Sequence, residues 1–150
     1  QKIFFTGIHY DIPYHIITGE KLMLKKEMEI LLVCGIANPA PLTAYIHEKT
    51  KTYDALFFSD HHIYSVDDFN DIKNRFEFLS EKEKIILTTE KDAVRLTKFK
   101  DKLNNLPFYV LPISQEFLFG QENEFIKMVE RYPNDFYEKE SKIMQEDQFA

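Results

Sequence analysis

The sequence lacks most of the features that indicate a self-contained catalytic chemistry. It has one cysteine, Cys34, which excludes a disulfide within the chain, and the flanking run "ILLVCGIA" predicts a buried thiol. No Walker-type phosphate loop GxxxxGK[ST], no GxSxG, no HExxH and no CxxC pair occurs. The segment "GIANPAP" contains a single glycine and is therefore not a GxGxxG fingerprint. On its own, this segment does not hold a nucleoside triphosphate in the usual way.

An excess of basic charge and a long apolar run are also missing. The net charge of -6 and the pI near 5.4 argue against electrostatic binding of nucleic acid along the whole chain, because such binding needs clustered lysine and arginine. The apolar runs are shorter than the roughly 20 residues that span a bilayer, and no signal peptide is visible. These absences predict a soluble, cytoplasmic domain with no nucleic-acid partner. Because the chain opens at Gln1 in strand-like sequence, without an initiator methionine, we expect a piece of a longer protein.

The pattern that is present is an alternation of strands and helices. A chain of 150 residues with 44% hydrophobic residues can bury one core. Within residues 1–27, the clusters "KIFFT" and "HIITG" predict a small β ribbon that serves as a linker or hinge. Residues 28–132 predict an α/β lobe, and residues 133–150 predict a polar, partly disordered tail. The predicted fold class is α/β, with an open, mostly parallel sheet and flanking helices, preceded by the ribbon.

Successive strand–helix units can be assigned within this lobe. The strand "EILLVCG" leads to a helix with Asn38 as its N-cap, and "DALFF" leads to a helix capped by Ser65 with Asp68. The strand "KIILTT" leads to the helix "EKDAVRLTKF", capped by Thr88 or Thr89. A last strand, "PFYVLPI", precedes a helix around residues 121–132.

The turn "SDHH" is the strongest candidate site. Asp60, His61 and His62 follow the carboxyl end of a predicted strand, where open α/β sheets bind their ligands. A histidine can take or give a proton near neutral pH, and a neighbouring carboxylate can orient its ring. The same three side chains could bind a divalent metal, although neighbours in extended chain point to opposite faces. A polar turn of solvated or hydrogen-bonded side chains is the alternative interpretation.

Two further loops could line the same crevice. In "TTEKDAVRL", the helix start, two threonine hydroxyls and Lys91 could receive a phosphate or a polar substrate. Capping, dipole-matched acids and a surface pair between Asp92 and Arg95 explain the same residues without a ligand. In "GIANPAP", the helix start at Asn38 offers similar groups. The candidates near substrate or nucleotide are Asn38, Thr89, Glu90, Lys91 and Asp92.

Five segments, taken in order, resemble one known family. "FFTGIHY", "ILLVCGIANPAPL", "LFFSDHHIYSVDDF", "IILTTEKDAVRL" and "LPFYVLPI" are similar to the C-terminal half of tetraacyldisaccharide 4'-kinases, the lipid A 4'-kinases of Gram-negative bacteria. The resemblance spans residues 2–113. It implies a P-loop-kinase-like C-terminal lobe of an enzyme that moves the γ-phosphate of ATP, with Mg²⁺, to the 4'-hydroxyl of a lipid A disaccharide 1-phosphate precursor.

The resemblance also implies a division of labour within a longer chain. An N-terminal lobe would carry the Walker A loop, the magnesium-binding acids and a membrane-associated helix, at the cytoplasmic face of the inner membrane. ATP and Mg²⁺ would be held mainly by that lobe, so the 150-residue chain is expected to be inactive alone. No metal site is assigned to this chain, and the ribbon would be the hinge between the lobes.

The catalytic role implied for this chain belongs to a histidine of its DH motif. In the family, that histidine works with an aspartate of the N-terminal lobe at the acceptor hydroxyl; the motif places the role on His61, beside Asp60, with His62 as the alternative. The family often has a proline before this motif, where this chain has Ser59. Two other classes stay open: a DHH-type metal-dependent phosphoesterase, which would need further acids besides Asp92, and a noncatalytic α/β binding domain.

Overall fold

The computed structural model describes residues 2–133, which divide into two compact units. Tyr10–Ile113 form the first, called the α/β unit below. The described parts of Gln1–His9 and Ser114–Ala150 form the second, called the ribbon–helix unit. Apart from residue 133, the tail expected over 133–150 lies outside the described residues. Residues 10–27 belong to the α/β unit, and the hinge role of residues 1–27 stays a prediction.

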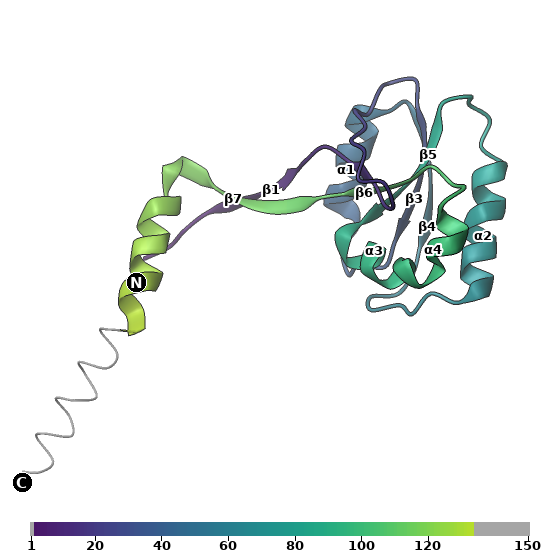
Figure 1. The fold of residues 1–150 in the computed structure, drawn as a ribbon. Coiled ribbons are helices and arrows are strands. Elements are labelled where there is room, and N and C mark those ends of the chain that lie inside the picture. The colour runs from purple at the N-terminus through teal and green to yellow at the C-terminus, as the bar shows by residue number, and fades with distance from the viewer. Residues whose placement is uncertain (1, 134–150) are drawn as a thin grey trace, which may run out of the picture. The chain divides into compact units, whose positions relative to one another are not determined.

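The described part of the α/β unit contains a five-stranded sheet with the order β2-β6-β5-β3-β4 (Figure 1). The strands are β2 (Tyr14–His15), β3 (Glu29–Cys34), β4 (Thr52–Phe57), β5 (Lys84–Thr89) and β6 (Phe108–Leu111). The pairs β3–β4, β3–β5 and β5–β6 are parallel, and β2 is antiparallel to β6. The prediction of an open, mostly parallel sheet with flanking helices is confirmed.

The helices start largely where the sequence predicts. They are α1 (Ala40–Lys49), α2 (Val66–Glu77), α3 (Glu90–Leu96) and α4 (Lys100–Leu103), with a 3₁₀ turn η1 at Thr97–Phe99. α2 has the predicted capping box of Ser65 and Asp68, and Thr89 caps α3. The cap predicted for α1 is displaced by one residue: Pro39 already has helical backbone angles and accepts the first helical bond, from Thr43 N. The Asn38 side chain still accepts a hydrogen bond from Ala40 N, at 3.1 Å.

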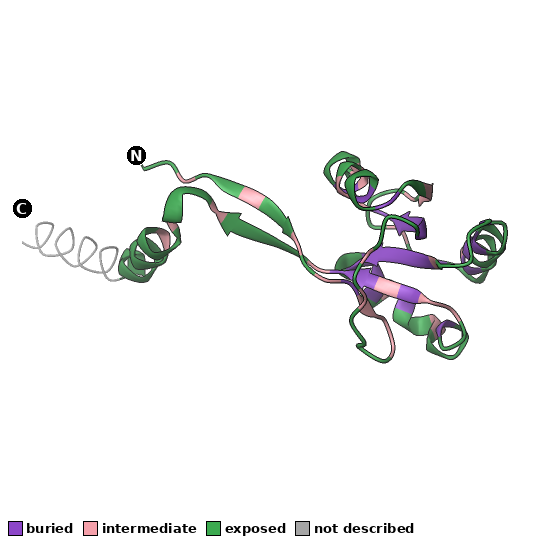
Figure 2. Cartoon of the chain, turned by 90° about the horizontal axis from the view of Figure 1, so that it is seen from above, coloured by how far each residue is buried: buried purple, intermediate pink, exposed green. Residues whose placement is uncertain are grey.

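The core of the α/β unit has one layer on each face of the sheet. Every residue of β3 is buried, and its alternate side chains belong to opposite layers, as expected for a strand covered on both faces. Leu31 and Val33 pack with α2, α3 and α4, while Ile30, Leu32 and Cys34 pack with α1. Figure 2 shows the buried sheet between helices with exposed outer faces. Cys34 is only 1% exposed, as predicted for a structural thiol.

A small β ribbon is present, but its two strands are not the clusters "KIFFT" and "HIITG". β1 (Thr6–Tyr10) pairs with β7 (Ile113–Phe117), which lies more than a hundred residues further along the chain. β2, which overlaps the second cluster at His15, joins the main sheet. The His15 ring contributes to this arrangement, because Nδ1 accepts from the backbone of Ile17 and Thr18 while Nε2 lies 3.2 Å from the Leu106 carbonyl oxygen.

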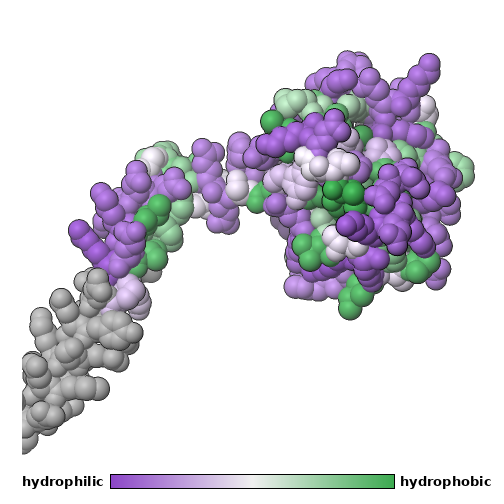
Figure 3. Space-filling view, viewed as in Figure 1, coloured by the Kyte–Doolittle hydropathy of each residue, from purple (hydrophilic) through white to green (hydrophobic). Residues whose placement is uncertain are grey.

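The ribbon–helix unit has its own small aromatic cluster. Phe4 and Phe117 both contact Phe125, with ring centroids 5.3 and 4.8 Å away. A 3₁₀ turn, η2 (Leu118–Gly120), leads to a helix over residues 122–133, close to the predicted range. Exposed apolar side chains of this helix are Ile126, Met128, Val129 and Tyr132, and Figure 3 shows apolar residues on the surface of this unit. Among residues 2–133, no helix has the length and apolarity to cross a bilayer.

Candidate functional site

Loops from three neighbouring strands meet at the carboxyl edge of the sheet. The pairing register places Cys34 opposite Phe57 and Val33 opposite Thr88, so the chain leaves β3, β4 and β5 at the same edge. Gly35 follows β3, the Asp60–His62 turn follows β4, and α3 follows β5. This edge is where open parallel sheets place their ligands. The structure therefore brings Gly35 of the "GIANPAP" segment together with "SDHH" and "TTEKD".

Asp60 is the anchor of the turn after β4. Its Oδ1 accepts a hydrogen bond from the backbone N–H of His61 at 3.0 Å and one from Lys91 Nζ at 2.5 Å. The Lys91 ammonium, with a smaller contribution from the His61 ring, lowers the pKa of the Asp60 carboxyl below its ordinary value. Asp60 is therefore an ionised, paired carboxylate near neutral pH, and it connects the turn to α3.

His61 presents its ring to solvent. Its φ of 61° lies in the left-handed region, which costs a residue other than glycine about 1–3 kcal/mol and is found at functional sites. The side chain is 75% exposed, with Nε2 3.6 Å from Asp60 Oδ2. On the other side of the ring, Nδ1 lies 3.3 Å from Arg95 Nη2. An exposed histidine held between a carboxylate and a guanidinium is available to a ligand.

His62 has different surroundings. Its ring stacks on Phe58, with centroids 4.6 Å apart, and meets the edge of Tyr64 at 5.1 Å. Its Nε2 lies 2.9 Å from Oδ2 of Asp68, the residue that also closes the capping box of α2. The Ser65 backbone N–H, followed by the His62 ring, lowers the pKa of the Asp68 carboxyl. His62 thus attaches the turn to α2, whereas His61 faces outward.

The pair between Asp92 and Arg95 is present, but it is not at the surface, because the Asp92 side chain is completely buried. Oδ2 accepts hydrogen bonds from Gly35 N at 3.0 Å and from Thr89 Oγ1 at 2.8 Å, and Oδ1 lies 3.3 Å from Arg95 Nη1. These donors compensate for the removal of the carboxylate from water. Gly35 permits the approach, since a Cβ there would lie 3.0 Å from the Ser59 carbonyl oxygen and 3.2 Å from Asp92 Oδ1. Asp92 therefore has a supporting role: it holds Gly35, Thr89 and Arg95 and is not accessible to a ligand.

The remaining predicted residues lie at the periphery of this cluster. Asn38 is exposed and makes its hydrogen bond within the start of α1. Glu90 Oε2 accepts from the backbone N–H of Ile113 at 3.3 Å, away from the Asp60–His62 turn. Sequence reasoning treated Arg95 only as a surface partner of Asp92. Its position four residues after Lys91 places both cations on one face of α3, and that spacing was the signal that could have linked Arg95 to the turn.

The described residues do not group into an obvious metal site. Within residues 2–133, no cluster of three or more histidine, cysteine, aspartate or glutamate side chains has a geometry that could hold a metal ion. In the turn after β4, Asp60 is paired with Lys91 and His62 with Asp68. The three side chains that the sequence offered as metal ligands are thus directed to separate partners.

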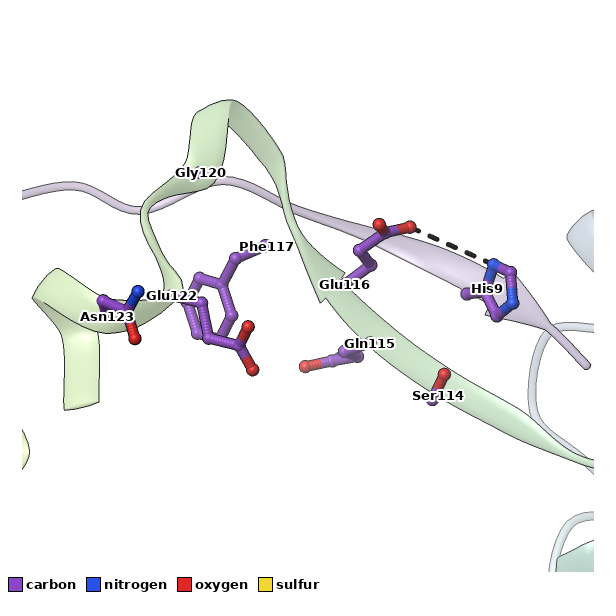
Figure 4. Close-up of a pocket in the computed structure, with 8 residues that line it drawn as sticks. All are labelled: His9, Ser114, Gln115, Glu116, Phe117, Gly120, Glu122 and Asn123. Carbon is purple, nitrogen blue, oxygen red and sulfur yellow. Dashed lines mark ion pairs between the residues drawn. The ribbon is translucent and has the colours of Figure 1, made fainter.

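A polar pocket of about 580 Å³ lies in the ribbon–helix unit (Figure 4). His9 Nδ1 and Glu116 Oε2 lie 4.0 Å apart on its wall, and both side chains are mostly exposed. None of the site residues predicted from the sequence lines it. Its lining residues are His9, Ser114, Gln115, Glu116, Phe117, Gly120, Glu122 and Asn123.

Comparison with known proteins gives one consistent family. A family model described as tetraacyldisaccharide-1-P 4'-kinase matches residues 8–133. The chain is 36% identical to the tetraacyldisaccharide 4'-kinase of Phocaeicola vulgatus over 138 residues, covering 88% of this chain and 38% of that protein. It is 40% identical to the enzyme of the same name from Bacteroides fragilis over 134 residues, covering 83% and 36% of the two chains.

A solved structure is also similar. It is the "apo" form of LpxK from Aquifex aeolicus in complex with ATP, with a TM-score of 0.49 and 20% sequence identity. The similarity covers 85% of this chain and 35% of that one. This chain therefore spans slightly more than a third of the length of these relatives.

Proposed function

The chain belongs to the tetraacyldisaccharide-1-P 4'-kinase family, and from this premise we propose that the full-length protein phosphorylates a lipid A precursor. In this proposal, the γ-phosphate of ATP moves to the 4'-hydroxyl of a tetraacyldisaccharide 1-phosphate. The match of the family model over residues 8–133 is the observation that carries the proposal. The α/β unit supplies part of the acceptor site, and the remaining length of the protein supplies the rest.

His61 is proposed as the catalytic residue of this chain. Phosphoryl transfer needs positioning, charge stabilisation and a group that orients or deprotonates the attacking hydroxyl. The ring of His61 is 75% exposed at the carboxyl edge of the sheet, whereas the His62 side chain is 26% exposed and paired with Asp68. His61 is therefore the more accessible of the two histidines, and this favours it over His62 as the catalytic residue. Asp60 stays ionised beside His61 and fixes the conformation of the turn.

The family resemblance gives His61 a partner from outside this chain. An aspartate of the N-terminal lobe would approach the same hydroxyl, so the two residues act together only when the lobes are assembled. Such an arrangement makes proton removal depend on lobe closure, which also excludes water from the transferred phosphoryl group. We propose that the full-length enzyme works at the cytoplasmic face of the inner membrane, which it reaches through the other lobe.

ATP and Mg²⁺ are proposed to bind mainly to that other lobe. The chain contains no GxxxxGK[ST] loop, and the carboxylates beside His61 are already paired, Asp60 with Lys91 and Asp92 with Gly35, Thr89 and Arg95. These residues do not fit a Mg²⁺ site, and no step of the reaction is assigned to a metal on this chain. When bound elsewhere, Mg²⁺ would neutralise charge on the phosphates.

The two other functional classes receive less support. A DHH-type phosphoesterase needs several free carboxylates at the sheet edge to hold two metals, whereas Asp60 and Asp92 are engaged in ion pairs. A noncatalytic domain would not require an exposed histidine in a left-handed turn, whose strain has to be compensated by the surrounding contacts. The match to a kinase family model favours the kinase over both.

Substitution of the histidines in the full-length protein tests the proposal. His61→Ala is expected to lower kcat for ATP-dependent phosphorylation of the lipid acceptor by roughly 10²–10⁴-fold, the usual contribution of acid–base catalysis. Its thermal unfolding should stay close to wild type, because the side chain is exposed. His47→Ala on α1 is the matched control and should keep wild-type turnover. A folded His61→Ala protein with wild-type kcat would refute the catalytic role.

A further inference from the structure

Arg95 is the one arginine that touches the candidate catalytic turn among the described residues. Its side chain is only 22% exposed, whereas that of Arg75 on α2, which is paired with Asp54, is 51% exposed. The two ends of the Arg95 guanidinium have different partners: Nη1 lies 3.3 Å from Asp92 Oδ1, and Nη2 lies 3.3 Å from His61 Nδ1. Arg95 therefore bridges a buried carboxylate and an exposed imidazole.

The buried end of this bridge is held by several hydrogen bonds. Asp92 lies at the start of α3, is completely buried, and accepts hydrogen bonds from Gly35 N and Thr89 Oγ1. These donors come from the ends of β3 and β5, so the carboxylate is fixed to the sheet and not to α3 alone. A guanidinium has a planar, fixed set of donors, so a carboxylate that holds one nitrogen also orients the others. The position of Arg95 Nη2 is thereby set by the sheet.

The exposed end constrains His61. Arginine only donates hydrogen bonds, so its contact with Nδ1 requires that nitrogen to be unprotonated and places the single ring proton on Nε2. Nε2–H, which lies 3.6 Å from Asp60 Oδ2, can then only donate to the oxygen of the acceptor hydroxyl, so His61 orients this hydroxyl and the aspartate of the other lobe removes its proton. One helical turn earlier, Lys91 holds Asp60, which in turn accepts the backbone N–H of His61. The backbone and the ring of His61 are thus both held from α3.

We infer that Arg95, oriented by the buried carboxylate of Asp92, is a positioning residue that fixes the ring of His61 with Nε2 toward the acceptor hydroxyl. The inference rests on the proposed function, because it assigns Arg95 an effect on turnover through His61. It also gives Asp92 a different role from the one expected from the sequence: Asp92 acts through Arg95 and does not contact substrate. Both contacts of 3.3 Å are long for hydrogen bonds and are expected to shorten when the acceptor is bound.

The primary test measures kcat and KM of the full-length protein carrying Arg95→Ala. Misplacement of a reacting group by about 1 Å can cost on the order of 100-fold in rate, so we expect kcat to fall roughly 10- to 100-fold. The KM values for ATP and for the lipid acceptor should be unchanged if Arg95 acts only through the His61 ring. Arg95→Lys should be similarly impaired, since one ammonium cannot reproduce the two-ended planar contact. Arg75→Ala is the matched control and should retain wild-type kcat and KM.

A double-mutant cycle separates positioning from a general effect on the fold. If Arg95 acts only through His61, Arg95→Ala should cause no further loss in a His61→Ala background. Equal losses in both backgrounds would overturn the inference, because they would show that Arg95 contributes independently of His61. Added guanidinium ion provides a second measurement: it should restore part of kcat to Arg95→Ala, where Asp92 remains to bind it, and should not restore His61→Ala.

Different results would contradict the positioning role of Arg95 and the catalytic role of His61. If His61→Ala is inactive while Arg95→Ala has wild-type kcat, the catalytic histidine stands and the positioning role falls. If His61→Ala itself has wild-type kcat, the catalytic assignment falls and the positioning role falls with it. A loss in Arg95→Ala that guanidinium does not restore and that is accompanied by a lower unfolding temperature than Arg75→Ala would assign Arg95 a structural role and overturn the inference.

Discussion

At the scale of single residues, the role of each side chain in the site depends on its surroundings more than on its residue type. His61 and His62 are adjacent, yet one is exposed in a left-handed turn and the other is stacked on Phe58 and paired with Asp68. Sequence alone left the choice between them open, because Phe58 and Asp68 are recognisable as partners only once the chain has turned. The same holds for Cys34, whose burial was predicted but whose charged neighbour was not.

Cys34 makes the free energy of unfolding depend on pH. Burial, with a smaller contribution from the negative charge of Asp92, raises the pKa of the Cys34 thiol to about 12 from an ordinary value of 9.0. Below pH 9 the thiol is protonated in both folded and unfolded chains. Between pH 9 and about 12, the unfolded chain loses this proton and the folded chain keeps it. The unfolded state is then favoured as the pH rises.

We predict that the free energy of unfolding falls above pH 9 by about 1.4 kcal/mol per pH unit on account of Cys34. Urea unfolding of wild type and Cys34→Ala, compared from pH 8 to about pH 10.5, isolates this contribution. Burial also raises the pKa of Tyr64, and because Cys34 contributes only a small part of that shift, the effect of Tyr64 largely cancels in the comparison. The stability advantage of wild type over Cys34→Ala should shrink above pH 9. Parallel curves over this range would contradict the prediction.

At the scale of elements, the site depends on how closely the end of β3 approaches the turn after β4 and the start of α3. Gly35 donates to Asp92 and leaves no space for a side chain, since a Cβ would lie 3.0 Å from a backbone oxygen of Ser59 and 3.2 Å from Asp92 Oδ1. The first of these contacts involves main chain, which cannot rotate away. Because Gly35 has no side chain, the end of β3, the turn after β4 and the start of α3 can approach one another closely.

Gly35→Ala is predicted to destabilise the protein by about 1–3 kcal/mol, the usual cost of forcing extra atoms into a packed region. Turnover of the full-length protein should fall as well, because the added methyl group displaces Asp92 and, through Arg95, the His61 ring. The control is Gly7→Ala in β1, where the added Cβ would make an ordinary 3.5 Å contact with Leu118. Urea unfolding checks the stability and phosphate transfer checks the activity. Equal stability of the two variants would show that the approach of Ser59 can relax.

The elements that the sequence predicted well are those specified by local signals. The strands β3, β4 and β5 are apolar runs followed by caps, and the Ser65–Asp68 capping box is readable over four residues. The features that the sequence did not reveal depend on residues distant in the chain. β1 pairs with β7 across more than a hundred residues, and Asp92 is buried because Gly35 approaches it from another strand. A seven-residue helix such as α3 has too few turns for its pattern to reveal which face is covered.

At the scale of the whole molecule, we propose that the catalytic apparatus is divided between this chain and the remaining length of the full-length protein. The chain covers 38% of the Phocaeicola vulgatus enzyme and 36% of the Bacteroides fragilis enzyme. In this proposal, the chain contributes the edge of the sheet with the exposed His61, which Asp92 and Arg95 support. What its sequence does not contain is a GxxxxGK[ST] loop to cradle the phosphates of ATP.

The 150-residue chain is therefore predicted to turn over no ATP and to transfer no phosphate to a tetraacyldisaccharide 1-phosphate. A histidine that orients the acceptor accelerates transfer only if the γ-phosphate is held in line with the hydroxyl, and the backbone that holds it is absent from this sequence. Radiolabelled phosphate transfer and ADP release would be measured on the purified chain, with circular dichroism to establish that it is folded and the full-length protein as the positive control. ATP turnover that persists in the purified chain and disappears in His61→Ala would show that this chain holds a complete active site, and would refute the division of the catalytic apparatus between two lobes.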